Sequence, residues 1–414
     1  MPNTLNTLKN APGVIAKMAA QMLEEKVQFA KSIDKADSSD YDGKNGYQAG
    51  DTIYISKPAR FTVGTNADIT SAIQDVQEEK VALTLDQRKV IGIALTSSEI
   101  ATDMALQGWA KRVLEPAVSR MAQEIEKDFL TVATQATANG VGTAGSTIFD
   151  TDTVLAAGQK IDEFACPDMD GRFILLNPAA NRSAVNARKG LFQSASDIAA
   201  QYKSGYMGEA DGFTFLRNNL VYSHTAGTAN VTGVTASANL TSGSANIALT
   251  GLGNTLTVTK GTIFTLAGIN AVHPITKQDL GYPKQFCVSA TVTSSAGGAA
   301  TVVATEVVYS SAAGALQNVA SLAANGVAVT FFQPTVSSVR AQNLAYHKSA
   351  FRMVSVPLVT PGGLDMTAQA TSDGGFTIRV VRDYDVLTDK LIMRLDFLGG
   401  IAPVRPEWAA RVTA

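Results

Sequence analysis

The sequence has few of the residues that build disulfides, metal sites and catalytic centres. Its 414 residues include two cysteines, Cys166 and Cys287, and three histidines, His224, His273 and His347. It contains no CxxC pair and no Cys/His cluster, which argues against a disulfide framework and a zinc site. No histidine has a partner at i+3 or i+4, and no GxSxG motif supplies a nucleophile. We therefore expect no catalytic residue, no metal and no cofactor.

The sequence is also poor in charge and lacks long apolar runs. Charged residues make up 17% of the chain against a usual share of roughly 25%, and the formal net charge is -2. A dedicated nucleic-acid binder normally carries a basic face, so this balance argues against one. No stretch of about 18 apolar residues could span a membrane, and the first residues lack the apolar core of a signal peptide. A soluble, cytoplasmic protein is the default expectation.

Two motifs resemble ligand sites but fail the test of context. Gly140 to Gly145 read GVGTAG, a literal GxGxxG, but the motif follows a predicted helix and does not open one. A dinucleotide site needs the strand-to-helix order, so a helix-ending loop is predicted instead. Asp168, Asp170 and Gly171 resemble the start of a calcium loop, but the third ligand and the distant Glu are missing. This second motif predicts a turn.

The N-terminal region predicts a helix followed by a linker. Ile15, Met18 and Met22 follow helical spacing within residues 11–33. The next stretch, Asp34 to Gly46, is rich in Asp, Ser and Gly and has almost no apolar side chain. We therefore expect residues 1–46 to form an arm and linker whose apolar stripe has no neighbour in sequence to cover it.

In residues 47–96 the apolar residues recur at every second position, as in strands. Ile53 and Ile55, Val81 to Leu85, and Ile91 to Leu95 alternate with polar or small residues. The segment between the first two runs predicts the tip of a long two-stranded excursion that cannot all pack on its own core. Its charges, including Glu78 to Lys80, are either solvated faces of strands or partners for a neighbour's opposite charges.

Residues 97–135 return to helical spacing with one apolar stripe, and Pro116 must begin or kink the long helix. The stripe consists of Leu114, Val118, Met121, Ile125, Phe129 and Val132. A helix from Glu115 to Gln135 would be roughly 30 Å long at 1.5 Å per residue, which makes it a spine. Residues 150–222 alternate helical stretches with short strands, a pattern of α/β or α+β domains.

The composition changes sharply between Ser223 and Ser338. This stretch holds five charged residues, which are Lys260, Lys277, Asp279, Lys284 and Glu306. Alternating runs at 255–259, 262–268, 286–293, 301–309 and 326–332 predict an antiparallel all-β module. Because residues 341–414 resume the earlier mixed character, the module reads as an insertion into an α/β domain.

This order of elements resembles the major coat protein of P22-like tailed bacteriophages, which has the HK97 capsid fold with an inserted β-barrel domain. The likeness covers nearly the whole chain. Its most specific parts are residues 260–272 (KGTIFTLAGINAV), 343–351 (NLAYHKSAF), and 378–385 (IRVVRDYD) through Arg405 to Trp408. The resemblance implies an α+β HK97-like subunit with an N-terminal arm, an extended β loop, a long spine helix and the inserted barrel.

The resemblance also implies a domain layout. It consists of an arm and linker (1–46), the extended loop and strands (47–96), the peripheral domain with the spine (97–149), the axial domain (150–222 and 341–385), the inserted β-barrel (223–340) and a return to the periphery (386–414). Inserted domains of this family can carry charged loops that bridge subunits across two-fold axes. Because residues 223–338 are nearly free of charge here, such a bridge is not carried over.

The function implied is that of a major capsid protein without catalysis. It would assemble into hexamers and pentamers of an icosahedral shell, guided by a scaffolding protein into a procapsid that expands as double-stranded DNA is packaged. A portal protein and the DNA, bound without sequence specificity, would be its partners besides itself. Assembly would take place in the cytoplasm of the host bacterium, the protein would end in the virion, and no membrane would be involved.

Physical reasoning from the sequence agrees with this role. An exposed stripe and unpaired strand edges invite other copies of the chain, and many weak contacts act together in a shell. The residues expected at subunit contacts are Ile15, Met18, Met22, Lys57, Arg60, Glu78, Glu79 and Lys80. The alternative is a secreted β-rich adhesin or surface-layer protein, suggested by the Thr/Ser/Gly-rich centre, and an enzyme comes third.

Overall fold

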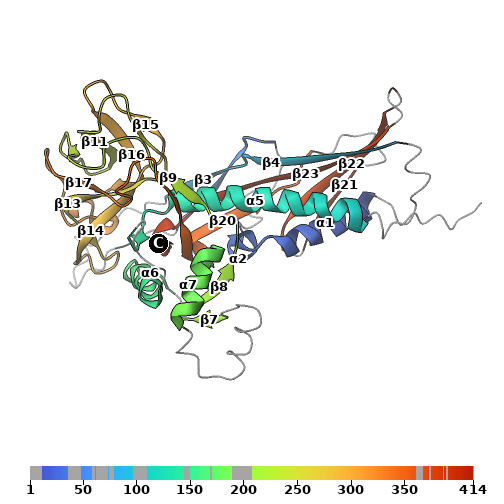
Figure 1. The fold of residues 1–414 in the computed structure, drawn as a ribbon, viewed down its shortest axis with the longest axis horizontal. Helices are drawn as coiled ribbons and strands as arrows, with labels where there is room; N and C mark the ends of the chain where they lie inside the picture. The colour runs from blue at the N-terminus through green and yellow to red at the C-terminus, as the bar shows by residue number, and fades with distance from the viewer. Residues whose placement is uncertain are drawn as a thin grey trace, which may run out of the picture. The chain divides into compact units, whose positions relative to one another are not determined.

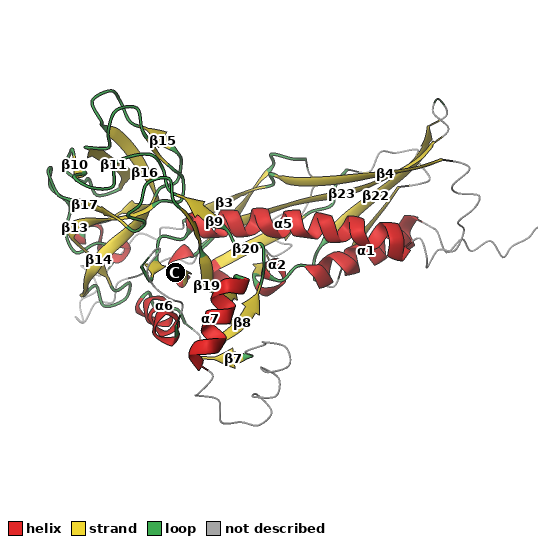
Figure 2. Ribbon diagram, viewed as in Figure 1, coloured by secondary structure: helices red, strands yellow, loops and turns green. Residues whose placement is uncertain are grey.

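The contacts of the chain divide it into two compact units, drawn as a ribbon in Figures 1 and 2. Unit 1 consists of residues 1–55, 80–129 and 352–402, and unit 2 of residues 56–79, 130–351 and 403–414. The computed structural model describes residues 12–35, 48–57, 61, 73, 79–96, 110–143, 150–167, 170–188, 208–359, 367–372, 374–385, 387 and 390–413.

Unit 1 is built on a six-stranded sheet. In order across the sheet, its strands are β1 (Asp34–Lys35), β20 (Phe351–Ser355), β23 (Lys390–Pro403), β22 (Thr377–Asp385) and β21 (Thr367–Thr371), and β4 (Gln87–Thr96) also pairs with β23. β4 runs antiparallel to β23 along its whole length, with Thr96 opposite Lys390 and Gln87 opposite Gly399. Met393, Leu395 and Phe397 of β23 alternate toward one buried face, as the period of a strand requires.

Three helices accompany this sheet. α1 (Pro12–Lys26) packs against β21 and β22, and α2 (Phe29–Ser32) follows it. The predicted spine is α5 (Glu115–Ala136), preceded by the π-helical turn η2 (Ala110–Leu114). Its predicted stripe is buried from Leu114 to Phe129. Pro116 lies in the first turn of α5, where its missing N–H removes no helical hydrogen bond.

The N-terminal helices belong to unit 1, which corrects the expectation of a separate arm with an uncovered stripe. Ile15 is buried, together with Ala16, Ala19 and Leu23 on the same face of α1. The Glu126 carboxylate of α5 accepts hydrogen bonds from the N–H groups of Gln28, Phe29 and Ala30 at 3.2, 2.7 and 3.4 Å. Of the predicted stripe only Ile15 lies on the buried face, which α1 packs against strands more than 300 residues later in the chain.

The grouping of strands in unit 1 also differs from the predicted layout, which joined residues 341–385 to residues 150–222. β20 and β22 pair with β23, and β21 pairs with β22, so these strands belong with the N-terminal helices and β4. The sequence pattern identifies such segments as strands but does not identify their partners.

Unit 2 contains a second six-stranded sheet. The order is β5 (Gly140–Val141), β24 (Ala409–Val412), β19 (Asn343–His347), β6 (Arg172–Leu176), β8 (Phe213–Arg217) and β7 (Glu209–Ala210). α6 (Thr151–Glu163) packs on β24, and α7 (Pro178–Arg188) packs on β6. Asp150 begins α6 by accepting the Thr153 N–H at 2.9 Å, the usual N-cap arrangement. The short helices η4 (Lys348–Ala350) and η5 (Pro406–Trp408) complete this part.

The charge-poor module is inserted between two strands of this sheet, β8 and β19. The chain leaves through β9 (Ser223–Thr225) and returns through β18 (Val339–Ala341), and these two strands pair antiparallel. We call this strand pair the neck. Within the module the strands are β10 (Thr235–Ala236), β11 (Ser244–Thr250), β12 (Thr257–Val258), β13 (Ile263–Val272), β14 (Asp279–Cys287), β15 (Val292–Thr293), β16 (Ala300–Val308) and β17 (Val329–Phe331), with the short helix η3 (Ser311–Leu316).

The module has its own apolar core and a pairing path that returns to its start. One sheet has the order β10-β11-β16 and another the order β14-β13-β17. Single bridges between Thr235 and Ala328 and between Val288 and Ala304 join the edges of these two sheets. The core includes Ile247, Phe264, Phe286 and others from both sheets. Each of the five alternating runs contains a strand, and β11 is a further strand that the sequence reasoning did not identify.

Candidate subunit-contact surfaces

The first candidate surface lies on the paired strands β2 (Thr52–Ser56) and β3 (Lys80–Thr84). Ile53 and Ile55 are buried, whereas Tyr54 between them is 61% exposed. Phe61 and Ile73, two described residues of the segment that connects the strands, are 61% and 74% exposed. Large exposed apolar side chains such as these are candidates for contacts with other proteins. The alternation of Ile53, Tyr54 and Ile55 already carried this signal, but the sequence reasoning did not single out Tyr54.

The charges predicted to act at subunit contacts lie on the same excursion. Lys57 Nζ is 3.7 Å from the Glu79 carboxylate, and the Lys57 N–H donates to the Glu79 carbonyl at 2.8 Å. These two predicted residues therefore pair with each other within one chain, in an exposed ion pair worth only about 0–1 kcal/mol. Lys80 is exposed at the start of β3. Arg60 and Glu78 lie outside the described residues.

The second candidate surface is the outer edge of β4. Among the described strands β4 pairs with β23 alone, and no described strand pairs with its other edge. On the face of the sheet away from α5, Val90 and Ile392 are exposed. Arg379 and Arg394 on this face both pair with the fully buried carboxylate of Asp396. The surface is therefore a strand edge without a described partner strand, beside a small apolar area that carries arginine side chains.

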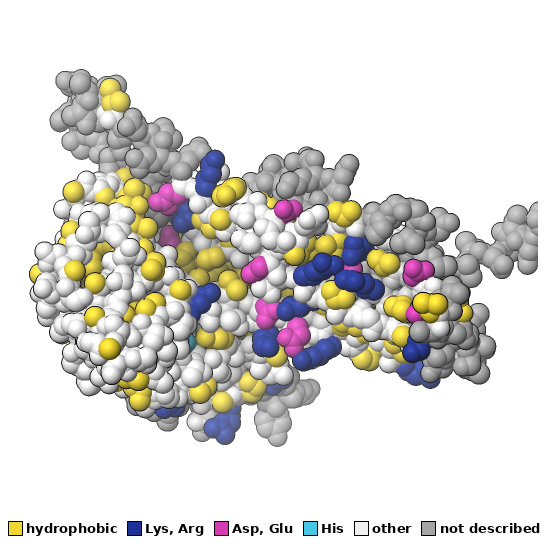
Figure 3. Space-filling view, turned by 90° about the horizontal axis from the view of Figure 1, so that it is seen from above, with side chains coloured by type: hydrophobic (Ala, Val, Ile, Leu, Met, Phe, Trp, Pro, Cys, Tyr) yellow, Lys and Arg dark blue, Asp and Glu magenta, His cyan; other side chains and the backbone are white. Residues whose placement is uncertain are grey.

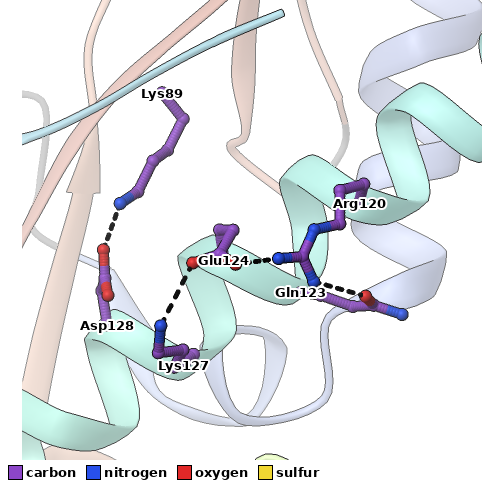
Figure 4. A network of polar contacts seen from close by, with 6 residues as sticks. All are labelled: Lys89, Arg120, Gln123, Glu124, Lys127 and Asp128. Carbon is purple, nitrogen blue, oxygen red and sulfur yellow. Dashed lines mark hydrogen bonds and ion pairs between the residues drawn. The ribbon is translucent and has the colours of Figure 1, made fainter.

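The opposite face of β4 is joined to the spine helix α5 by an ion pair. Figure 4 shows Lys89 reaching from β4 to the Asp128 carboxylate of α5, in an ion pair that the two side chains form directly. Along the exposed face of α5, Glu124 pairs with Arg120 at i-4 and with Lys127 at i+3. Such exposed pairs stabilise a helix by only a few tenths of a kcal/mol each. They make this face of α5 hydrophilic, with two cations sharing one carboxylate.

The predicted apolar contact residues of α1 have different surroundings. Ile15 is buried inside unit 1 and is not available to a neighbour. Met18 and Met22 are half-buried at the margin of the same face. Their part in subunit contacts stays a prediction, and it no longer includes Ile15 because that side chain is already buried.

The surface of the inserted module is nearly free of charge. In Figure 3 its strands lie under mainly white and scattered yellow side chains, and blue and magenta are sparse there. Two of its five charged residues, Lys284 and Glu306, pair at 2.8 Å with Lys284 buried. Lys277 donates to the carbonyls of Ala315 and Gln317 at 2.7 and 3.2 Å. Charges available for a bridge to another subunit are therefore scarce on this module.

The residues whose sequence motifs resemble ligand sites take part in ordinary contacts of the fold. Gly140 begins β5, which pairs in parallel with β24, so the start of the GxGxxG motif is a strand at a sheet edge. The His347 Nε2 atom lies 3.1 Å from the Asp170 carbonyl oxygen. Across the described ranges, no three or more His, Cys, Asp and Glu side chains gather where a metal ion could bind. No helix of the described chain has the length and apolarity that a membrane span needs.

Comparisons with known proteins identify the family. The family model described as "P22 coat protein - gene protein 5" matches residues 5–411. No curated protein matches the chain. Among solved structures, the chain is similar to one titled "Mycobacterium phage Che8", at 12% identity and a TM-score of 0.47, covering 93% of this chain and 90% of that one. It is also similar to the "Capsid of Ralstonia phage GP4", at 8% identity and a TM-score of 0.48, covering 94% and 90%.

The family match extends over nearly the whole chain, from the first helix to the last strand. It confirms the predicted coat-protein family and a structural rather than enzymatic role, and the described helices and strands form the predicted α+β fold. It gives no support to the adhesin alternative. The chain therefore belongs to the P22 coat protein family, and it is a major capsid protein that forms an icosahedral phage shell with other copies of itself.

Proposed function

We propose that copies of this chain join through the two candidate surfaces, the β2–β3 excursion and the outer edge of β4. Assembly is guided by a scaffolding protein into a procapsid, in the cytoplasm of the host bacterium. The procapsid includes a portal protein, and it expands as double-stranded DNA is packaged. These partners and steps follow from the resemblance to the coat proteins of P22-like phages.

The observation that carries the proposal is the exposure of Tyr54, Phe61 and Ile73 on one excursion of the chain. Covering these three side chains would remove roughly 350 Å² of apolar surface from water, or about 9 kcal/mol at 25 cal/mol per Å². Loss of rigid-body freedom and ordering of side chains offset most of that gain. Each contact is therefore weak, and a shell is stable because every subunit makes several contacts at once.

The charge of the chain fits a shell that confines DNA without gripping it. Its formal net charge is -2. Each phosphate contact would add affinity that depends on salt, and an expanding shell gains nothing from such attachment. We propose that the packaged DNA is held by confinement and not by specific contacts.

We also propose that residues 223–340 form a closed β-barrel domain within the subunit. The pairing path that returns to its start and the separate apolar core support this. A module with several paired strands and an apolar interior can be stable by itself. The excised fragment 223–340 should therefore give dispersed amide signals and a cooperative melt, and a random-coil spectrum would remove the proposal.

The proposed contacts predict assembly with a concentration threshold. Light scattering and electron microscopy of the purified chain, with and without its scaffolding protein, should show closed shells above that threshold. Tyr54→Asp should raise the threshold or abolish shells while the melting curve of the free chain stays unchanged, because the side chain is exposed. Val339→Asp is the matched control, since Val339 is 60% exposed on a strand outside both surfaces.

Two results would count against this proposal. If Tyr54→Asp assembles like the wild type, the excursion does not contribute a contact through this side chain. If the wild-type chain stays monomeric at every concentration even with scaffolding protein, the chain does not assemble through surfaces of its own.

A further inference from the structure

Buried polar groups of the inserted module and of the unit 2 sheet meet beside the neck. Arg411 of β24 is only 1% exposed, and its guanidinium reaches into the module. Nη1 donates to the Gly261 carbonyl at 2.6 Å, and Nη2 donates to Cys287 Sγ at 3.0 Å. The Cys287 thiol in turn donates to the Gln135 carbonyl at 3.0 Å. A cation is thus held in the interior by a carbonyl oxygen and a sulfur atom and not by a carboxylate.

His224 of β9 lies in the same cluster and is 3% exposed. Its Nε2 is 3.3 Å from Thr262 Oγ1. That hydroxyl is 2.8 Å from the Thr259 carbonyl and donates its proton there, and we therefore assign Nε2 as the protonated nitrogen that donates to it. Nδ1 then carries a lone pair, and in the described part of the chain it has no hydrogen-bond partner. A proton added to His224 would go to Nδ1.

The surroundings of His224 disfavour that proton. Burial and the nearby charge of Arg411 lower the pKa of His224 to about 4. The other titratable groups facing the cluster are the Tyr222 ring, 6.2 Å from the imidazole by centroids, and the Cys287 thiol, whose pKa burial raises. Lys260 and Glu306 act on the Cys287 thiol, and Glu306 is paired with Lys284. A protonated His224 would therefore be a second buried cation without an acceptor for its new N–H.

We propose that the neck is an acid-sensitive latch, in which protonation of His224 releases the inserted module from the unit 2 sheet. In the closed state the imidazole is neutral, is hydrogen-bonded to Thr262 and lies near the charge of Arg411. In the open state it is solvated and accepts a proton freely. This inference concerns the single subunit and does not depend on the proposed contact surfaces.

The direction and size of the effect follow from linkage. Because the pKa of His224 is lower in the closed state, the open state binds more protons, and the latch loses stability as the pH falls from 6.5 toward 4. With an open-state pKa of about 6.5, the opening equilibrium should rise about 30-fold between pH 7.5 and pH 5. Above pH 7 His224 is almost entirely neutral in both states, so it should give the opening equilibrium almost no dependence on pH.

Cys287 provides the measurement, because its buried thiol becomes reactive only when the junction opens. In the full-length chain carrying Cys166→Ser, labelling by 4,4′-dithiodipyridine is followed at pH 5 to 7.5. Each rate is divided by the rate of the denatured chain at the same pH, which removes the intrinsic pH dependence of the thiol. Protection of Cys287 should fall about 30-fold at pH 5 in this chain and stay nearly constant in His224→Gln.

His273→Gln is the matched control, because His273 is in the same module and caps a surface turn, where it accepts from the Ile275 and Thr276 N–H groups. It should keep the full pH dependence. Hydrogen exchange in β22 and β23 of unit 1 should stay slow at pH 5, which separates release of the module from global unfolding. If His224→Gln does not fold, the chain that carries only Cys166→Ser still tests the proposal. Its Cys287 labelling rate and the titration of the His224 imidazole, followed by NMR, should both change between pH 7.5 and pH 5.

Three results would overturn the latch. The first is constant protection of Cys287 down to pH 5. The second is an equal pH dependence in His224→Gln, which would place the trigger elsewhere. The third is simultaneous loss of protection in β22 and β23, which would mean that acid unfolds the whole chain.

Discussion

The buried carboxylate of Glu126 gives the sharpest test of how the N-terminal helices are held. It accepts three backbone N–H groups, from Gln28, Phe29 and Ala30, at the point where α2 begins. These donors have no partner within a helix that has just started, so the carboxylate replaces the missing carbonyls. Glu126→Gln keeps the shape of the side chain, but it removes the charge and turns one acceptor oxygen into an N–H₂ donor.

The size of the effect can be worked from these contacts. A hydrogen bond to a charged group contributes about 1.5–3 kcal/mol, and the two longer contacts contribute less than the one at 2.7 Å. We expect Glu126→Gln to lower the free energy of unfolding of the α1–α2 segment by about 2–4 kcal/mol. Glu124→Gln is the matched control, because Glu124 lies two positions earlier on α5 in exposed ion pairs and should change stability by about 0–1 kcal/mol.

Native-state hydrogen exchange on the full-length chain measures this directly. Amides of residues 15–33 should exchange about 30- to 1,000-fold faster in Glu126→Gln, while amides of the unit 2 sheet keep their protection. If Glu126→Gln and Glu124→Gln behave alike, the carboxylate does not anchor α2. If exchange instead rises equally throughout the chain, the contact supports global folding and not this segment.

Three further predictions concern the core and the buried charges. Leu23→Ala should lower the free energy of unfolding by about 2–5 kcal/mol in urea melts, because α1 packs on the sheet, while Gln21→Ala should leave it unchanged. Equal, small effects of the two changes would mean that α1 is a separate arm after all. Asp396→Asn should lower it by about 3–5 kcal/mol, since it leaves two arginines without their buried counter-ion, and a loss below 1 kcal/mol would contradict this reading. Lys160 donates to the Gly140 carbonyl and to Gln285 Oε1, and burial lowers its pKa to about 8, so the folded state binds fewer protons than the unfolded chain above that pH. Urea melts should therefore show stability gained between pH 7.5 and 9.5 in the wild type relative to Lys160→Met, and parallel pH profiles would refute the assignment.

The sequence by itself determined much of the local structure and the identity of the family. The spine helix followed from one apolar stripe between Leu114 and Phe129, because a helix brings every third or fourth residue to one face. The inserted module followed from its five charges and its alternating runs. The family followed from the order of elements, which is a property of the chain and needs no coordinates.

Only the tertiary structure decided which segments meet. A period of two tells which face of a strand is buried, but it does not say that β4 pairs with β23 or that β21 and β22 cover α1. The anchor of α2 joins residues nearly a hundred positions apart, and the latch joins His224 to Arg411 across most of the inserted module and the returning strands. Buried polar contacts of this kind are set by where distant backbones pass each other, and local pattern carries no information about that distance.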